Sequence, residues 1–562
     1  MAIHPAIVDL LSRLAPDQRA AATAPPGPVL CVAPAGSGKT TTLVARIAWL
    51  VASGVDPATI AAITFNRRAA EELSQRLVEA LAPLAVPPGS VRVRTFHALG
   101  LEVLREAGRS TGPLVERTAV LRRIAPDAGP SGWRRLDTLV SRMKLDLGLT
   151  ADDVAADERA GPIARTFVAY ERAFAATGGL DFDDLVVRSL RLLERDGSVR
   201  DTWRSRCSHL LVDEVQDVDR SQLRLALLLA APTNRIFLVG DDDQSIYGWR
   251  LADVRRVLDL AASLPGLRRV DLRTNYRCPV PVVERAVRLV AVNGERFAKR
   301  IEPRPGAAGR LVLAPDGSDD SIRLRRVLLA FGSEDGTTRA VLARTNRELR
   351  PAAAAALALG MPFRAAGLIL LIESPLVDDL IAAARPDRPA LVALAAVVAE
   401  EQRAAAGRLD SLDDGDPLRD RLAIARALLG WCPPHRDLGA LTGAVADARR
   451  RLTELRRDDA ALTLATVHGT KGLEFDHVAV IGLEEGRFPS ARALADAPDP
   501  DRAMEEERRL AYVAWTRARR SLTLVYDPVT PSRFLLEAFS PTEVDRPAPA
   551  APISRRDAGA AR

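Results

Sequence analysis

A glycine-rich turn near the N-terminus has the composition that binds nucleotide phosphates. The apolar run Val29–Val32 predicts a buried strand, and the turn after it leads into a helical pattern. Gly36 and Gly38 let the backbone N–H groups point inward at an anion, and the following helix adds its positive N-terminal end. Lys39 is placed to reach the outer phosphates, and the Thr40 hydroxyl to bind Mg²⁺. The competing interpretation is an ordinary glycine-rich turn between a strand and a helix.

The predicted phosphate-binding residues are Ala33, Pro34, Ala35, Gly36, Ser37, Gly38, Lys39, Thr40 and Thr41. Ala33 is a departure, because a first glycine is common at this position of the motif.

Two acidic side chains follow a second apolar run, at residues 210–212. An apolar strand that ends in Asp-Glu after a phosphate-binding turn is the arrangement in which Asp213 binds Mg²⁺ and Glu214 activates the attacking water. Gln244, after a third apolar run at 236–240, suits contact with a γ-phosphate or its water. Gln18, about ten residues before the first strand, suits an adenine, because an amide both donates and accepts hydrogen bonds.

Two aromatic residues, Tyr247 and Trp249, follow Gln244 closely in a chain that is only 4% aromatic. Aromatic side chains on a loop beside a nucleotide site suggest that the bases of a single strand stack there. The competing interpretation is packing of both rings in the core.

The elements that must position these residues are short apolar strands alternating with helical patterns. Further strands are expected at 60–65, 91–96 and from 462, and residues from about 98 to 205 are mostly helical in pattern. The acidic turn 181–184 reads as the N-cap of a helix. The chain from 541 onward, rich in Pro, Ala and Arg, is expected to be disordered.

The composition limits the class of protein. A chain of 562 residues with 47% hydrophobic residues is expected to form several domains, and its net charge of +6 is compatible with a nucleic-acid partner without requiring one. The four cysteines are scattered and predict neither zinc nor disulfides. No segment suggests a membrane span or a signal peptide, so we expect a cytoplasmic protein.

Several stretches occur in one order that is typical of a known family. They are PAGSGKTTTL, ITFNRRAAEEL, TFHALG, LVDEVQD, VGDDDQSIYGWR, LRTNYR, LATVHGTKGLEF and EEERRLAYVAWTRA. Together they resemble the motifs of superfamily one DNA helicases of the UvrD/Rep/PcrA type, over residues 14–377 and 461–535.

The resemblance implies an α/β fold of two RecA-like motor domains, each a parallel sheet flanked by helices and each carrying a mostly helical insertion. It implies ATP and Mg²⁺ as cofactors, with Gln18 and Tyr276 at the adenine, Glu474 near the ribose and phosphates, and Arg277 and Arg517 as arginine fingers. It also implies a path for single-stranded DNA. The residues expected to line that path are Phe65, Thr95, His97, Tyr247, Trp249, Arg250, Arg344 and His468.

The expected domains follow from the order of the motifs. They are a first motor domain (1–97 and 205–272), its insertion (98–204), a second motor domain (273–377 and 461–540), its insertion (378–460) and a disordered tail (541–562). The second insertion is shorter than is usual in the family and lacks a Gly-Ile-Gly turn. Leu251 stands where the family usually has glycine, Trp515 replaces a smaller residue, and Gly469-Thr470 replaces Ala-Ser.

Three functions remain open at this point. The first is a DNA helicase that moves 3′-to-5′ on single-stranded DNA and unwinds duplexes in repair or replication, acting as a monomer on single strands and junctions. The second is a translocase that unwinds weakly and strips proteins or serves a repair partner. The third is an ATP-gated DNA-binding protein without turnover, which the intact Lys39, Asp213 and Glu214 argue against.

Overall fold

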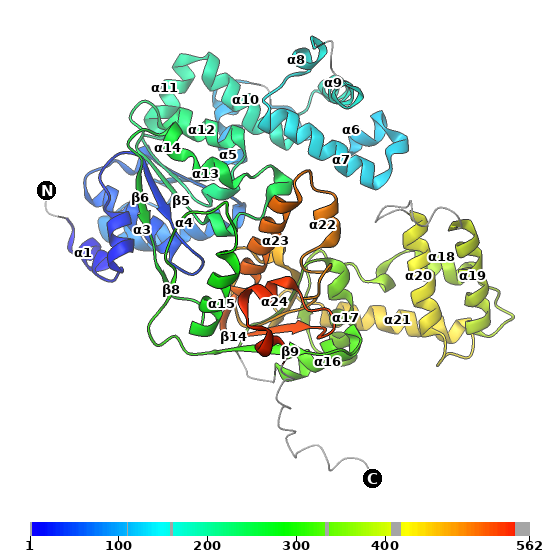
Figure 1. Ribbon diagram of the computed structural model, residues 1–562. Helices are drawn as coiled ribbons and strands as arrows, with labels where there is room; N and C mark the ends of the chain where they lie inside the picture. The colour runs from blue at the N-terminus through cyan, green and yellow to red at the C-terminus, as the bar shows by residue number, and fades with distance from the viewer. Residues whose placement is uncertain (1–2, 110, 158–160, 332–335, 406–416, 546–562) are drawn as a thin grey trace. The chain divides into compact units, whose positions relative to one another are not determined.

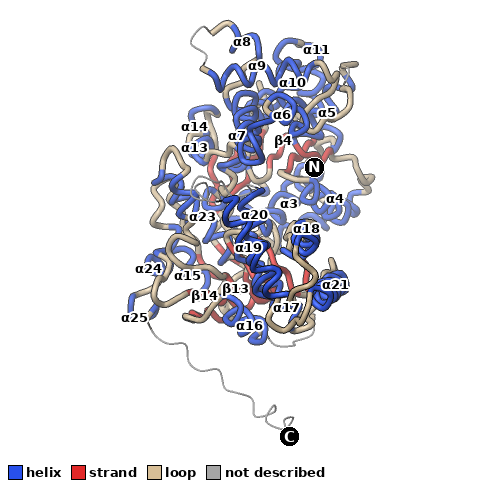
Figure 2. Tube along the Cα trace, turned by 90° about the vertical axis from the view of Figure 1, so that its right-hand side faces the viewer, coloured by secondary structure: helices blue, strands red, loops and turns tan. Residues whose placement is uncertain are grey.

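The structure is a computed structural model that describes residues 3–109, 111–157, 161–331, 336–405 and 417–545. The chain divides into two compact units. The first comprises residues 1–275, 295–301 and 369–449, and the second comprises 276–294, 302–368 and 450–562. Each unit contains one six-stranded parallel sheet (Figures 1 and 2), so the predicted α/β class is confirmed.

The first sheet has the strand order β3-β2-β4-β5-β1-β6. Its strands are β1 (Val29–Val32), β2 (Ile60–Thr64), β3 (Arg92–Thr95), β4 (His209–Val212), β5 (Ile236–Gly240) and β6 (Arg268–Asp271). Alternate side chains enter two different cores, so that Leu30 packs on one face of the sheet and Cys31 on the other. Burial on both faces is why these strands are continuous apolar runs in the sequence.

Helices of the first unit cover both faces of this sheet. They are α1 (Pro5–Ser12), α2 (Pro16–Ala22), α3 (Lys39–Ala52), α4 (Arg67–Leu81), α5 (Phe96–Glu106), α10 (Phe182–Arg195), α11 (Gly197–Arg206), α12 (Arg220–Ala230), α13 (Val254–Leu258) and α14 (Leu260–Ser263). The strand β7 (Thr274–Asn275) follows them.

Only part of the predicted insertion 98–204 has a core of its own. Helices α6 (Arg117–Ile124), α7 (Gly129–Ser141), α8 (Ala151–Ala155) and α9 (Pro162–Ala175) pack around Phe167 and Tyr170. By contrast, α5, α10 and α11 supply Val103, Leu190 and Trp203 to the core of the first sheet. Helical periodicity in the sequence does not reveal which partner a helix packs against, so the difference is visible only in the fold.

The second sheet has the strand order β11-β12-β10-β13-β14-β9. Its strands are β9 (Arg310–Pro315), β10 (Arg339–Ala343), β11 (Phe363–Arg364), β12 (Leu462–Thr466), β13 (Phe475–Val480) and β14 (Ala518–Tyr526). The other elements of this unit are β8 (Glu302–Pro303) and the helices α15 (Val280–Val290), α16 (Asp320–Ala330), α17 (Asn346–Ala358), α22 (Ala491–Ala495), α23 (Pro500–Trp515), α24 (Arg533–Ala538) and α25 (Pro541–Val544).

The predicted second insertion, 378–460, contains helices α19 (Ala390–Ala405), α20 (Pro417–Trp431) and α21 (Leu438–Leu455), and α18 (Leu376–Ala383) begins two residues before it. They enclose a separate core that includes Leu394, Leu428 and Leu441. None of the helices in the described ranges has both the length and the hydropathy to cross a bilayer.

The predicted start of the disordered tail is wrong. Residues 541–544 form α25, Val544 is buried, and its carbonyl accepts a hydrogen bond of 2.7 Å from the Tyr526 hydroxyl. The remainder of the predicted tail, residues 546–562, lies outside the described residues. All four cysteines are buried and free.

Candidate nucleotide and nucleic-acid sites

The glycine-rich turn joins β1 to α3 with the backbone that the sequence predicts. Gly36 and Gly38 have φ values of +68° and +86°, and Gly38 is the N-cap of α3. The φ of Gly38 favours glycine, and a Cβ there would also lie 2.6 Å from Nε2 of Gln18, which would have to shift. Ala33 needs no such freedom, because its N–H donates to the Gly240 carbonyl at 2.8 Å and thereby extends the pairing of β1 with β5.

Two amide side chains donate hydrogen bonds to backbone carbonyls of this turn. Gln18 donates from Nε2 to the Ser37 carbonyl at 2.8 Å and accepts at Oε1 from the Ala15 N–H at 3.1 Å. Asn275 donates from Nδ2 to the Ala35 carbonyl at 2.8 Å. The predicted contact of Gln18 with adenine stays a prediction, and its amide retains one N–H and one lone pair for it.

The acidic pair after β4 lies against the turn. Lys39 Nζ contacts Glu214 Oε2 at 3.0 Å, although the two residues are far apart in sequence. Glu214 adopts a φ of +51°, a conformation that costs a non-glycine residue free energy and that clusters at functional sites. Asp213 accepts from the Glu214 N–H at 2.9 Å. The structure therefore brings together Lys39, Asp213 and Glu214, which were predicted to act together.

Electrostatics keep Lys39 charged. Burial by itself lowers the pKa of a lysine, but the carboxylates of Glu214, Asp241 and Asp213 outweigh it and raise the pKa of Lys39 above its ordinary value. A permanent ammonium at the turn is what a phosphate group requires as a counter-charge.

The residues of the turn suit a phosphate and Mg²⁺. The hydroxyl of Ser37 is buried and has no hydrogen-bond partner among the described residues, which is unusual for a buried polar group. The hydroxyl of Thr40 and the carboxylate of Asp213 are oxygen ligands, and Mg²⁺ commonly takes only one or two from the protein beside phosphates and water. The described chain has no group of three or more His, Cys, Asp or Glu placed to hold a metal ion.

Gln244 belongs to the same hydrogen-bonded system. Its Nε2 donates to Asp241 Oδ2 at 2.7 Å, and the Asp241 N–H donates to Gln216 Oε1 at 3.0 Å. Gln216 in turn donates from Nε2 to Glu214 Oε2 at 2.6 Å. The sequence analysis missed the part played by Gln216 and Asp241, although both lie inside motifs that it quoted.

An aromatic group lies on the loops that follow β2 and β5. The rings of Phe65 and Tyr247 stack with centroids 4.9 Å apart, and Trp249 meets Tyr247 edge-on at 6.2 Å. The Arg250 guanidinium lies 4.6 Å from the Trp249 ring centre. Trp249 is 56% exposed, so the alternative that it packs in the core is wrong. Tyr247 is half-buried, and burial raises its pKa to about 12.

A second aromatic pair lies after β3. His97 meets Phe182 edge-on at 5.7 Å, and burial lowers the pKa of His97, so this imidazole is neutral at pH 7. Thr95 is the N-cap of α5, accepting from the Ala98 N–H at 3.2 Å. Phe182 is 61% exposed, and the sequence analysis missed it because it treated residues 181–184 only as a helix cap.

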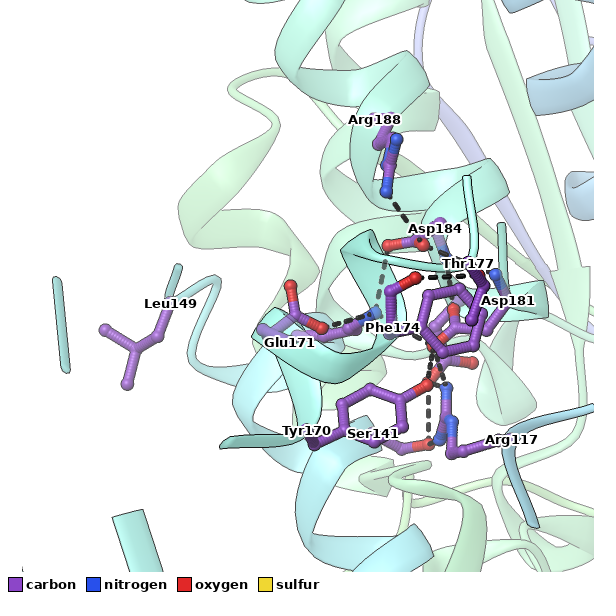
Figure 3. Close-up of polar contacts among 12 residues, drawn as sticks. Arg117, Ser141, Leu149, Tyr170, Glu171, Phe174, Thr177, Asp181, Asp184 and Arg188 are labelled. Atoms are coloured by element: carbon purple, nitrogen blue, oxygen red, sulfur yellow. Dashed lines mark hydrogen bonds and ion pairs between the residues drawn. The ribbon is translucent and has the colours of Figure 1, made fainter. Parts of the chain in front are cut away.

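The cap prediction itself is confirmed, and the cap belongs to a buried ionic network (Figure 3). Asp181 caps α10 through the Asp184 N–H at 2.8 Å, while its Oδ2 accepts from Arg117, Lys144 and Tyr170 at 3.0, 2.8 and 2.8 Å. Lys144 also contacts Asp184 and Glu171, each at 2.9 Å. The network joins the small helical core of α6–α9 to the residues that flank Phe182.

The residue after Arg250 explains a departure noted in the sequence. Leu251 has a φ of +68°, a left-handed conformation that glycine adopts without strain. The backbone therefore keeps the shape that suits the glycine usual in the family, although the residue is leucine.

In the second unit the structure brings together three of the predicted nucleotide-site residues. Arg277 Nε contacts Glu474 Oε2 at 2.7 Å, and Arg277 Nη1 donates to the Thr516 carbonyl at 3.2 Å. Arg517 is fully buried and donates to the carbonyls of Val513 and Leu473, at 2.9 and 3.2 Å. Although burial raises the pKa of Glu474, Arg277 outweighs it and lowers that pKa below the ordinary value.

The remaining predicted residues of this unit are Tyr276, Arg344 and His468. Tyr276 is 39% exposed. Arg344 is paired with Glu507 at 2.7 Å. Burial, helped by the charge of Arg344, lowers the pKa of His468 to about 4, so this side chain is neutral at pH 7. The roles predicted for these residues stay predictions.

A parallel sheet with this glycine-rich turn after β1 and an Asp-Glu pair after β4 defines a P-loop NTPase. The family model described as UvrD/REP helicase N-terminal domain matches residues 14–265, and that of the UvrD-like helicase C-terminal domain matches residues 446–528.

Named relatives match almost the whole chain. ATP-dependent DNA helicase UvrD2 of Mycobacterium bovis is 32% identical, over 98% of this chain and 85% of its own length. ATP-dependent DNA helicase UvrD1 of Mycobacterium tuberculosis is 29% identical, over 91% and 82%. DNA helicase II of Escherichia coli is 28% identical, over 92% and 85%. The chain belongs to the UvrD/Rep helicase family.

Proposed function

We propose that this chain is an ATP-dependent DNA helicase whose ATPase is stimulated by single-stranded DNA. The observation that carries the proposal is one loop, residues 241–250, that bears both kinds of site. Gln244 is hydrogen-bonded into the system of Lys39 and Glu214, and Trp249 is exposed a few residues later. A change at the phosphates therefore reaches the aromatic group through a short segment of backbone.

The topology of the first sheet also supports a nucleotide site and a nucleic-acid site that lie close together. The P-loop, Phe65, Asp213 and Gln244 follow β1, β2, β4 and β5 respectively, and Thr95 is the last residue of β3. All five strands are parallel, so these residues lie at one edge of the sheet, where ligands bind in open α/β folds.

The chemistry follows from the residues. Lys39 and the N-terminus of α3 would bind the phosphates, and Thr40 and Asp213 would hold Mg²⁺, which neutralises charge on the transferred group. Glu214 would accept the proton of the attacking water, and Gln244 would orient that water. The nucleotide contacts predicted for Gln18, Tyr276, Arg277, Glu474 and Arg517 stay predictions. Exposed Trp249 and Phe182 would stack bases, with Arg250 contacting the backbone.

The test is ATP hydrolysis measured without nucleic acid and with single-stranded DNA, duplex DNA or RNA. We expect single-stranded DNA to give the largest rate. Lys39→Ala should abolish turnover, because the phosphates lose their fixed counter-charge. Stimulated turnover that survives in Lys39→Ala would refute the assignment of the site.

Movement from 3′ to 5′ and strength of unwinding are finer parts of the proposal. A short second insertion favours translocation that outpaces unwinding, with 3′-tailed duplexes better substrates than blunt ones. Streptavidin displacement from either end of a single strand reports polarity, and strand separation of tailed duplexes reports unwinding. Clearance of the 3′ end alone would reverse the polarity, and robust unwinding of blunt duplexes would show that the insertion is not limiting.

A further inference from the structure

Three consecutive carboxylates after β5 are buried around one lysine. Asp241, Asp242 and Asp243 are each at most 1% exposed, and the side chain of Lys299 is completely buried. Lys299 Nζ lies 2.8 Å from Asp241 Oδ1 and 2.9 Å from Asp243 Oδ2, and it also contacts Asp242. Buried carboxylates without a cation are very costly, so this ammonium is needed for the loop to adopt its conformation.

Lys299 lies on a short segment, two other residues of which are also hydrogen-bonded to these aspartates. Residues 295–301 belong to the first unit, although the chain on both sides of them belongs to the second. Arg296 contacts Asp243 through two hydrogen bonds, of 2.9 and 2.7 Å, and the Phe297 N–H donates to Asp242 Oδ2 at 2.8 Å. The position of the ammonium is thus fixed by its backbone as well as by its charge.

Asp241 connects this lysine to the hydrolytic residues. One carboxylate oxygen of Asp241 accepts from Lys299, and the other accepts from the amide of Gln244 at 2.7 Å. The Asp241 N–H holds Gln216, which donates to Glu214 at 2.6 Å. The chain of contacts therefore runs from a buried lysine to the two side chains proposed to orient and activate water.

We propose that Lys299 is a positioning residue for ATP hydrolysis, which fixes the Gln244 amide and, through Gln216, the Glu214 carboxylate by holding Asp241. This inference rests on the proposed ATPase. Without the ammonium, the three carboxylates repel one another. Asp241 would then move, and its hydrogen bond with the Gln244 amide would be lost. The Lys39 site itself remains intact, so turnover should suffer more than nucleotide binding.

The experiment compares Lys299→Met with Arg296→Met in the full chain. Both substitutions remove a cation from the same segment, but Arg296 is bonded to Asp243, whereas Lys299 also contacts Asp241. Active sites are counted by titration with a fluorescent ATP analogue, stimulated ATPase is measured per active site, and thermal unfolding is recorded for each variant. The Arg296 variant should lose thermal stability, with a much smaller loss of kcat than the Lys299 variant.

We expect Lys299→Met to lower kcat by about 10²-fold, the usual effect of a misplaced catalytic group, with a much smaller change in KM. If that variant does not fold, Asp241→Asn decides, because it keeps the size and still leaves Lys299 two carboxylates. An asparagine cannot accept from both Lys299 and Gln244 through its two terminal atoms, so it should show the same kcat loss. Equal kcat losses in the Lys299 and Arg296 variants, or a normal kcat in Asp241→Asn, would overturn the inference. An inactive wild type would instead refute the proposed function.

Discussion

Replacing Trp249 with alanine should separate DNA binding from stability. The indole is 56% exposed and touches the rest of the fold mainly through the edge of Tyr247 and the Arg250 guanidinium. Loss of one base–aromatic stack weakens single-strand binding by about 1–3 kcal/mol, which corresponds to about 5-fold to 150-fold in Kd. The lost ring contact contributes only about 0.5–1.5 kcal/mol to folding.

The assay is a fluorescence anisotropy titration of a labelled oligonucleotide at several salt concentrations, paired with thermal unfolding of the same preparation. Trp249→Ala should weaken binding at every salt concentration by a similar factor, because a stack involves no ion release. Arg250→Ala should instead reduce the salt dependence by about one phosphate contact. ATP hydrolysis in the absence of DNA should be unchanged in both variants.

Trp431→Ala is the matched control, since this tryptophan is also exposed, at 39%, but is the last residue of α20, in the group of helices α18–α21. It should leave single-strand binding unchanged. Normal DNA affinity in Trp249→Ala would refute the proposed stacking surface. A loss of affinity accompanied by a large fall in unfolding temperature would show that the ring acts through packing.

Three further substitutions test other parts of the structure. Glu214→Gln should keep ATP affinity but slow hydrolysis by about 10²–10⁴-fold in single-turnover assays, because the group that accepts the water proton is lost; a parallel loss of affinity would contradict that role. Lys144→Met should lower the free energy of unfolding by about 3–5 kcal/mol in denaturant titrations, because the buried carboxylates lose their cation. The control is Arg188→Ala, which removes a 47% exposed partner of the same network and should cost less than about 1 kcal/mol. Burial raises the pKa of Asp219 from 3.8 to about 7, so its favourable contribution to folding is complete below pH 3.8 and is lost as pH rises through 7. The unfolding temperature of Asp219→Asn should therefore rise relative to that of the wild type between pH 5 and pH 8. A difference that stays constant over this range would exclude the titration.

The sequence alone predicted those elements whose formation depends on residues close to one another in the chain. The runs at 29–32 and 236–240 form the predicted strands, since a strand buried on both faces must be apolar throughout. The cap at Asp181 was likewise predictable, because an N-cap depends on residues three positions apart. The P-loop conformation follows from Gly36 and Gly38.

Contacts between distant segments could not be predicted in this way. Lys299 lies in the short segment between Gly294 and β8, and no sequence pattern near it predicts a contact with Asp241. The exposure of Trp249 and Phe182 depends on how their loops leave the sheet, so a local pattern could not decide between stacking and packing. Which helices of the predicted first insertion cover the sheet could not be predicted for the same reason, since α5 and α10 look alike in sequence whether they cover a sheet or stand apart.

The chain contains four lysines, Lys39, Lys144, Lys299 and Lys471, among 79 basic residues, and the first three are shielded by carboxylates. A compact ammonium can contact three surrounding carboxylates, as Lys299 does with Asp241, Asp242 and Asp243. The cysteines are buried as well, and burial raises the pKa of Cys207 to about 12, so its reactive thiolate is scarce. Amine- and thiol-directed dyes should therefore react poorly with these side chains in the native protein. A cysteine introduced on the surface would consequently be labelled selectively, with the native cysteines left in place, which suits this chain to site-specific fluorescence measurements of its motion.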